Sequence, residues 1–248
     1  MWAQTLVAGS RYVHVFDPAN ARRTVLDSAF NVVRTDPLPG QVRSGIAVRA
    51  DAVLFAADLR TPSLVGKPLH LLDTLGGLFS FGETGEVYRG DLRYQSVGGT
   101  ADDVWTVENY QYRLTRWDLS TRQPMVSFFK RARWFDGNAQ SLWPRPYLRG
   151  IRPDSVGLWV IGQTPDPDWT DFHTESRPIP KNPPHEVFDG VIDLVDPHSG
   201  RTISHSRWDD VFIGFVSGSD LIARYRESEM GIPYIDLLRL RLTRPPAP

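Results

Sequence analysis

Short runs of β-branched and aromatic residues, separated by turn-forming residues, recur along the chain. The clearest group contains four consecutive runs, at 94–97, 104–107, 112–117 and 125–129, each closed by Asp, Gly, Asn or Ser. Runs of this length and composition predict consecutive antiparallel strands joined by tight turns. Because the same four-part phrase returns elsewhere in the chain, the pattern favours a β-propeller in which each phrase forms one blade.

The repeat predicts an all-β fold, with residues 1–248 forming a single propeller domain of four-stranded antiparallel blades. In each blade, we name the strands A to D from the innermost outward. The first unit reads as starting at strand B and the last as ending at strand C, so these two blades are expected to be incomplete. The approximate blades are 1–36, 41–83, 93–136, 146–208 and 210–243. A non-closed β-sandwich or barrel is the alternative architecture.

One large apolar residue marks the expected strand B of every unit. These residues are Trp2, Phe55, Trp105, Trp159 and Ile222. The first three intervals between them are about 50 residues, which is the scale of propeller repeats. We therefore expect Phe55, Trp105 and Trp159 to pack between neighbouring blades.

Two segments resemble the repeat of a known group of propellers. Residues 44–48 (SGIAV) and 52–58 (AVLFAAD) are similar to the "G-I-A-V … hydrophobic-Ala-Asp" phrase of NHL-type and YVTN-like bacterial six-bladed β-propellers. Residues 103–107 and 116–118 look like the same phrase in another blade. The resemblance implies blades stacked around a channel and, often, a binding platform. A few relatives in the wider superfamily are enzymes.

Five units are recognisable where the resemblance implies six. We therefore expect this chain to be the C-terminal part of a longer propeller, truncated by an internal or misassigned start. The upstream reading frame tests this expectation, because an in-frame stop immediately before Met1 would refute it. The N-terminus shows no signal-peptide pattern, although a longer parent protein could carry a secretion signal for the periplasm or the exterior.

The composition is that of an ordinary globular protein, with 41% hydrophobic and 23% charged residues. A formal net charge of −1 without blocks of like charge argues against a nucleic-acid partner, which would require a basic patch. The lack of cysteine excludes disulfides, thiolate chemistry and cysteine-ligated zinc. No apolar run reaches the roughly 20 residues needed to cross a bilayer, so we expect no membrane span. These features leave the compartment undetermined.

No established catalytic motif occurs in the chain, and we assign no catalytic residue. The H-E-x-x-H, G-x-S-x-G, P-loop and G-x-G-x-x-G patterns are all missing. Ser217 lies in 214–218 (GFVSG), which lacks the spacing of a nucleophile elbow. The six histidines are scattered, so we assign no metal ligand and expect no cofactor, with calcium as the one metal to consider.

The most informative irregular segment is the insertion at 163–186, between strands B and C of the fourth unit. B–C and D–A connections share one face of a propeller, and long loops in compact domains are often functional. Its closely spaced carboxylates suggest a hard cation such as calcium, but their spacing does not match an EF-hand loop. Three interpretations stay open: a cation site, a lid that contacts a ligand, and a decoration that only packs on the blades.

Other connections would bring aromatic and charged residues to the same face. Aromatic rings with arginine and carboxylates suit a sugar or a peptide, because a ring offers apolar area while charges fix orientation. The two tryptophans could instead anchor their loops on the blades. The predicted binding residues are Asp166, Asp168, Trp169, Asp171, His173, Arg60, Tyr110, Trp143 and Arg145.

Two functions are compatible with these residues. The first is a non-enzymatic binding scaffold, and the alternative is a propeller hydrolase or lyase with paired carboxylates, as in glycosidases. An enzyme should gather acidic residues from the inner strands at the mouth of the channel. The expected inner strands carry Tyr94, Gln95, Arg149 and Arg152, with no acid in their middles. This pattern favours the binding scaffold.

Overall fold

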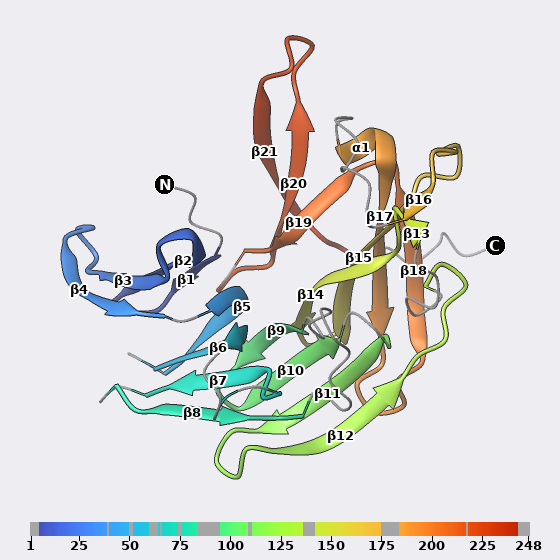
Figure 1. The fold of residues 1–248 in the computed structure, drawn as a ribbon. Coiled ribbons are helices and arrows are strands. Elements are labelled where there is room, and N and C mark those ends of the chain that lie inside the picture. The colour runs from blue at the N-terminus through green and yellow to red at the C-terminus, as the bar shows by residue number, and fades with distance from the viewer. Residues whose placement is uncertain are drawn as a thin grey trace.

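The computed structural model describes residues 5–38, 40–49, 52–59, 64, 66–73, 76–83, 95–108, 111–135, 142–174, 184–216 and 218–242. Its regular structure is almost entirely antiparallel β, as predicted. Five sheets follow one another around a central region, from the N-terminal sheet to the C-terminal one (Figure 1). This arrangement is a β-propeller. It excludes a single continuous sandwich because each sheet is a separate hydrogen-bonded unit.

In the first three sheets, each strand pairs with the strands next to it in the chain. The first sheet contains β1 (Thr5–Ala8), β2 (Val13–Asp17), β3 (Arg22–Leu26) and β4 (Val32–Pro37), and the second contains β5 (Gly40–Arg49), β6 (Ala52–Leu59), β7 (Leu69–Leu72) and β8 (Leu78–Phe81). The third contains β9 (Gln95–Thr100), β10 (Asp103–Glu108), β11 (Arg113–Asp118) and β12 (Gln123–Phe129). The pairing within these three sheets is therefore local in sequence.

The fourth sheet contains β14 (Tyr147–Pro153), β15 (Leu158–Pro165), β17 (Phe188–Val195) and β18 (Thr202–Trp208). The fifth contains β19 (Val211–Phe215), β20 (Leu221–Glu227) and β21 (Pro233–Arg239). A separate two-stranded ribbon pairs β13 (Leu142–Trp143) with β16 (His173–Thr174). Two single-turn helices complete the described structure: the 3₁₀ turn η1 (Pro18–Asn20) and α1 (Pro184–Val187). No helix in the described residues is long and apolar enough to cross a membrane.

The first sheet corrects one prediction. The repeat predicts that the chain begins at strand B, but β1 is an innermost strand. It packs against β5, as β5 packs against β9, β9 against β14, and β14 against β19. The first sheet is therefore complete, with β4 as its outer strand. The sequence did not predict β4, because its residues are largely exposed on both faces and show no alternation of apolar and polar positions. The last sheet has three strands in the described residues, as predicted.

Each interface between sheets has its own apolar core. Phe55 packs with Phe16 between the first two sheets, and Trp105 lies in a cluster between the third and fourth. Trp159 packs with Phe212 and Ile222 between the fourth and fifth sheets. The prediction that the large residues at 55, 105 and 159 pack between blades is confirmed. Their bulk fills the wedge between two twisted sheets, where only side chains of this size reach across.

Candidate functional site

A pocket of about 330 Å³ lies where the connection between β12 and β14 meets the connection between β15 and β17. Aromatic, proline and charged side chains form its wall. The lining residues are Arg133, Trp134, Pro144, Arg145, Pro146, Thr164, Pro165, Asp166, Pro167, Trp169 and Phe172. We call this cavity the loop pocket. It contains three of the predicted binding residues, Arg145, Asp166 and Trp169.

The β13–β16 ribbon brings the two connections together. Trp143 pairs with His173 and Leu142 with Thr174, so a segment before the fourth sheet is bonded to the insertion within it. The connection spans 166–187 instead of the predicted 163–186, because β15 continues to Pro165 and β17 begins at Phe188. The predicted meeting of a D–A connection with the B–C insertion therefore occurs through backbone hydrogen bonds, which fix the position of both walls of the loop pocket.

Local hydrogen bonds shape the loop that follows β15. The Asp166 carboxylate accepts the N–H of Asp168 at 2.7 Å, and its carbonyl accepts the N–H of Trp169 at 3.1 Å. The indole N–H of Trp169 then donates to the carbonyl of Asp171 at 3.0 Å. Aspartate favours such turns because its side chain replaces a backbone acceptor. The loop thus holds Asp166 and Trp169 at the pocket while Asp168 and Asp171 remain outside its lining.

Trp134 forms the floor of the loop pocket on the side of the propeller core. Its ring packs edge-to-face against Tyr112 and Phe135, with centroid separations of 5.7 and 5.5 Å. A Cβ atom at Gly162 would lie 2.4 Å from the Trp134 ring, so only glycine lets the ring lie against β15. The Trp134 indole N–H has no acceptor among the described residues. The ring position is therefore set by tight packing, and its N–H is buried.

The two predicted tryptophans of this face also act as anchors. The Trp143 ring meets Phe188 edge-to-face at 5.7 Å, and Tyr147 approaches Phe188 at the same separation. Trp143 and Trp169 both pack against the buried cluster of Val187, Phe188 and Val211. The structure therefore supports the anchoring interpretation for both rings, while Trp169 lines the loop pocket as well.

The remaining predicted residues are not placed at the pocket. Arg60 and Tyr110 lie outside the described residues, as does the His173 side chain, although the His173 backbone belongs to β16. The sequence missed Arg133 and Trp134, which precede the predicted segment. The segment 131–134 (RARW) does not indicate a binding site, because a mixture of apolar and charged residues is typical of any surface turn.

An acidic cluster adjoins the loop pocket. Asp166, Asp189 and Asp209 each place one carboxylate oxygen within 4.8 Å of the other two. We call these three residues the acid trio. Asp166 follows β15, Asp189 lies on β17, and Asp209 occupies the turn between β18 and β19. The register explains their proximity: Asp189 pairs with Thr164, two residues before Asp166, and the next residue, Gly190, pairs with Trp208, which precedes Asp209.

Asp189 is the buried member of the acid trio, with 6% of its surface exposed. Its Oδ2 accepts a hydrogen bond from Nε of Arg207 at 2.5 Å, and the same guanidinium donates to the carbonyl of Pro165 at 2.9 Å. Burial raises the pKa of the Asp189 carboxyl; Arg207 lowers it, and the charges of Asp166 and Asp209 raise it further. The trio is therefore a site of unfavourable negative charge.

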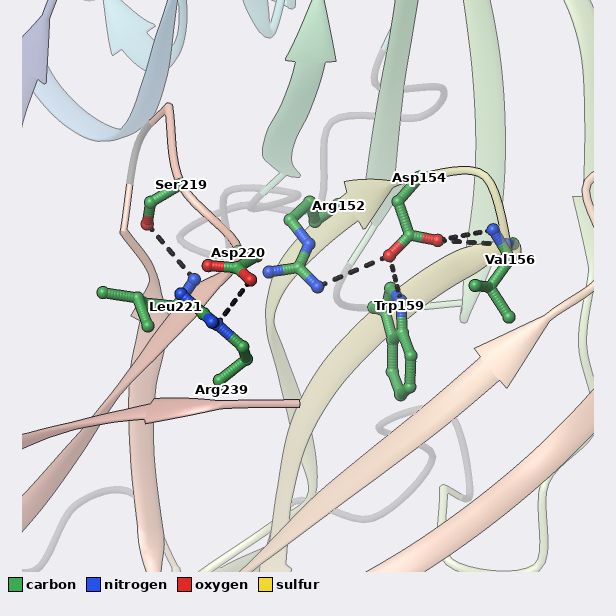
Figure 2. Close-up of polar contacts among 9 residues, drawn as sticks. Arg152, Asp154, Val156, Trp159, Ser219, Asp220, Leu221 and Arg239 are labelled. Atoms are coloured by element: carbon green, nitrogen blue, oxygen red, sulfur yellow. Dashed lines mark hydrogen bonds and ion pairs between the residues drawn. The ribbon is translucent and has the colours of Figure 1, made fainter. Parts of the chain in front are cut away.

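A second, larger cavity of about 750 Å³ lies at the centre of the propeller and is lined by the inner strands of all five sheets. Its acidic side chains, in the described lining, are Asp154 and Asp220. Figure 2 shows Arg152 between them, with an ion pair of 3.6 Å to Asp154, while Asp220 binds Arg239 at 2.6 Å. The indole of Trp159 also donates to Asp154 at 2.6 Å. Each of these two carboxylates thus contacts an arginine.

Comparisons by sequence identify no relative: neither a protein-family model nor a curated protein sequence matches the chain. Solved structures resemble it in fold. A member of the DUF4221 family from Bacteroides vulgatus has a TM-score of 0.56 at 8% identity over 93% of this chain and 76% of its own. Hydrazine synthase of Kuenenia stuttgartiensis has a TM-score of 0.55 at 10% identity, covering 90% of this chain and 61% of its own. A streptogramin B lyase structure has a TM-score of 0.50 at 10% identity, covering 97% of this chain and 84% of its own. Identities this low establish the fold alone.

Proposed function

We propose that this chain is a non-enzymatic binding propeller and that the loop pocket takes a carbohydrate. The observation that carries the proposal is the lining, which combines the rings of Trp134, Trp169 and Phe172 with two arginines and one carboxylate. A sugar presents an apolar ring face and several hydroxyls, so stacking and charge-assisted hydrogen bonds act together. The volume of about 330 Å³ suits one or two sugar residues, since ligand pockets begin at roughly 300 Å³.

Rigidity of the wall supports the same proposal. Four prolines, at 144, 146, 165 and 167, line the loop pocket and fix their backbone φ angles. The β13–β16 ribbon and the Asp166 turn hold the two walls in place before a ligand arrives. A pre-organised site loses little conformational entropy on binding, which favours a small and weakly apolar ligand. A peptide would need an extended groove, and it remains the alternative ligand that a binding screen distinguishes.

The direct test is a screen of the purified chain against oligosaccharides and peptides, followed by calorimetric titration of the best ligand. Phe172 is 44% exposed, so Phe172→Ala should leave the fold intact. We expect it to weaken carbohydrate binding about tenfold through the lost stacking contact. Phe129→Ala is the matched control, because Phe129 is 67% exposed on β12 and outside the lining. Equal affinity of both variants for the ligand would show that the loop pocket is not the binding site.

The alternative of a propeller hydrolase or lyase has less support. Such an enzyme would need carboxylates free to exchange protons or attack the substrate. In the central cavity, Asp154 and Asp220 are both neutralised by arginines. Turnover of chromogenic glycosides or esters that is lost on Asp154→Asn would establish the enzymatic alternative in place of the binding scaffold.

We also propose that the complete ring has six blades, as in the NHL-like bacterial propellers. Val7 of the first sheet faces the second sheet, so its strand neighbour Leu6, 62% exposed, points away from it. On the fifth sheet, Leu238 faces the fourth sheet, whereas Leu237 is 57% exposed. No packing between β19 and β1 comparable to that of the other inner strands is present in the described residues. A sixth sheet would cover both apolar faces.

The reading frame upstream of Met1 tests the six-blade proposal. It should encode one further set of four short strand-like runs in frame with this chain. Joined to residues 1–248, that segment should lower the binding of an apolar fluorescent dye, because it covers Leu6 and Leu237. A stop codon directly before Met1, or unchanged dye binding by the longer protein, would contradict the proposal.

A further inference from the structure

The acid trio carries more negative charge than its surroundings balance. Three carboxylates converge within 4.8 Å, and the basic side chain that contacts them, among the described residues, is Arg207. Like charges at this distance repel strongly in a partly buried site. One guanidinium leaves a local charge of about −2, which a divalent cation would neutralise.

The hydrogen bonds donated to the trio, from the Asp168 N–H and from Arg207, relieve this charge only in part. Arg207 binds Oδ2 of Asp189 and the carbonyl of Pro165, so it orients the carboxylate from one side. The other oxygen, Oδ1 of Asp189, is buried and has no hydrogen-bond donor among the described residues. The Asp189 side chain is only 8% exposed, so water does not compensate freely. A buried carboxylate oxygen without a donor is costly, and a bound cation would supply the missing partner.

We propose that Asp166, Asp189 and Asp209 bind a calcium ion, at a site that shares Asp166 with the loop pocket. Because the three oxygens lie within 4.8 Å of one another, each is at most about 2.8 Å from the centre of their triangle. Calcium–oxygen distances are about 2.3–2.6 Å, so the carboxylates need to close by a few tenths of an ångström at most. Magnesium requires about 2.0–2.1 Å with near-octahedral geometry and would demand a larger contraction.

The elements that carry the trio suit such a site. Asp189 is held by its pairing with Thr164 of β15, whereas Asp166 and Asp209 lie in a loop and a turn that can adjust to the ion. Calcium accepts six to eight oxygen ligands in flexible geometry. Three carboxylates, some of them bidentate, provide part of this shell, and water completes it. The ion would tie together the fourth and fifth sheets, since Asp209 connects β18 to β19.

The test uses the whole chain after dialysis against a chelator. Calorimetric titration with calcium chloride should show one saturable site, and magnesium should bind at least tenfold more weakly. At a free calcium concentration one hundred times Kd, the Tm should rise by about 5–10 °C, because the ion binds the folded chain alone. A chain that shows neither binding heat nor a shift in Tm with calcium would overturn the proposal.

Two conservative variants locate the ion. Asp209 is exposed, so Asp209→Asn should fold normally without calcium and lose the calcium-dependent rise in Tm. Asp168→Asn is the matched control, because Asp168 is an exposed aspartate two residues from Asp166 but outside the trio. It should keep the full rise. Equal calcium-dependent shifts in wild type and Asp209→Asn would place the ion elsewhere and contradict this site.

Discussion

Single residues in this propeller show how burial changes chemistry. His70, on β7, has 0% of its surface exposed. Its Nδ1 lies 2.7 Å from Oγ of Ser80 and its Nε2 lies 3.4 Å from the carbonyl of Ala57. Removal from water disfavours the charged imidazolium, and burial lowers the pKa of His70 to about 4 from an ordinary value of 6.5. A neutral histidine therefore belongs to the folded state.

This burial predicts a pH dependence of stability. The unfolded chain binds a proton at His70 below about pH 6.5, whereas the folded chain does so only near pH 4. The free energy of unfolding should therefore be highest above pH 6.5 and fall as the pH drops to 4, by about 3 kcal/mol from this residue. Urea denaturation at pH 7.5, 5.5 and 4.5 measures the effect.

His70→Gln provides the comparison for this prediction. The variant should be less stable at pH 7.5, because glutamine fits the site less well, but its stability should fall less steeply between pH 6.5 and 4. Parallel pH profiles for the wild type and the variant would show that His70 is not the residue responsible.

Residues of the core were predictable because each is large, apolar and repeated. Phe55, Trp105 and Trp159 recur at the repeat length, and a residue of this size has few places outside an interface between sheets. Charged residues carry no such signal. Asp189 and Asp209 are separated from Asp166 by 23 and 43 residues, so their proximity depends on pairing across β15, β17 and β18. No local pattern contains that information.

At the level of elements, the β13–β16 ribbon determines the loop pocket. The sequence predicted that segments around 143–145 and 166–173 share one face, from the rule that connections of the same kind lie together in a propeller. The ribbon itself was not predictable, because two-residue strands leave no periodic pattern. The first sheet was mispredicted for the same reason. Its exposed outer strand β4 has no apolar alternation and was not predicted, so the pattern assigns the inner strand β1 to strand B.

Trp143 should hold the ribbon on the propeller. Its edge-to-face contact with Phe188 and its half-buried position predict that Trp143→Ala lowers the free energy of unfolding by about 2 kcal/mol. Trp143→Phe should recover about half of this loss, because a smaller ring keeps part of the contact. Chemical denaturation measures both variants. A stability unchanged in Trp143→Ala would mean that the ribbon is held by other contacts.

At the scale of the whole molecule, the propeller places two cavities in different chemical settings. The central cavity is lined by inner strands, and its carboxylates are neutralised by Arg152 and Arg239. The loop pocket is lined by connections, and beside it lies the undercompensated acid trio. Strands of the ring supply stability through their interfaces, while the connections are free to carry a site. Because the strands repeat and the connections do not, the fold could be predicted from the sequence, whereas the site could be predicted only in part.

We expect ligand to bind at the loop pocket rather than in the central cavity. Hydrogen–deuterium exchange of the whole chain, with and without the best oligosaccharide from the screen, tests it most directly. We predict that the ligand slows amide exchange at 142–146 and 164–172 and leaves the inner strands β9 and β14 unchanged. Protection confined to β9 and β14, which line the central cavity, would contradict the account.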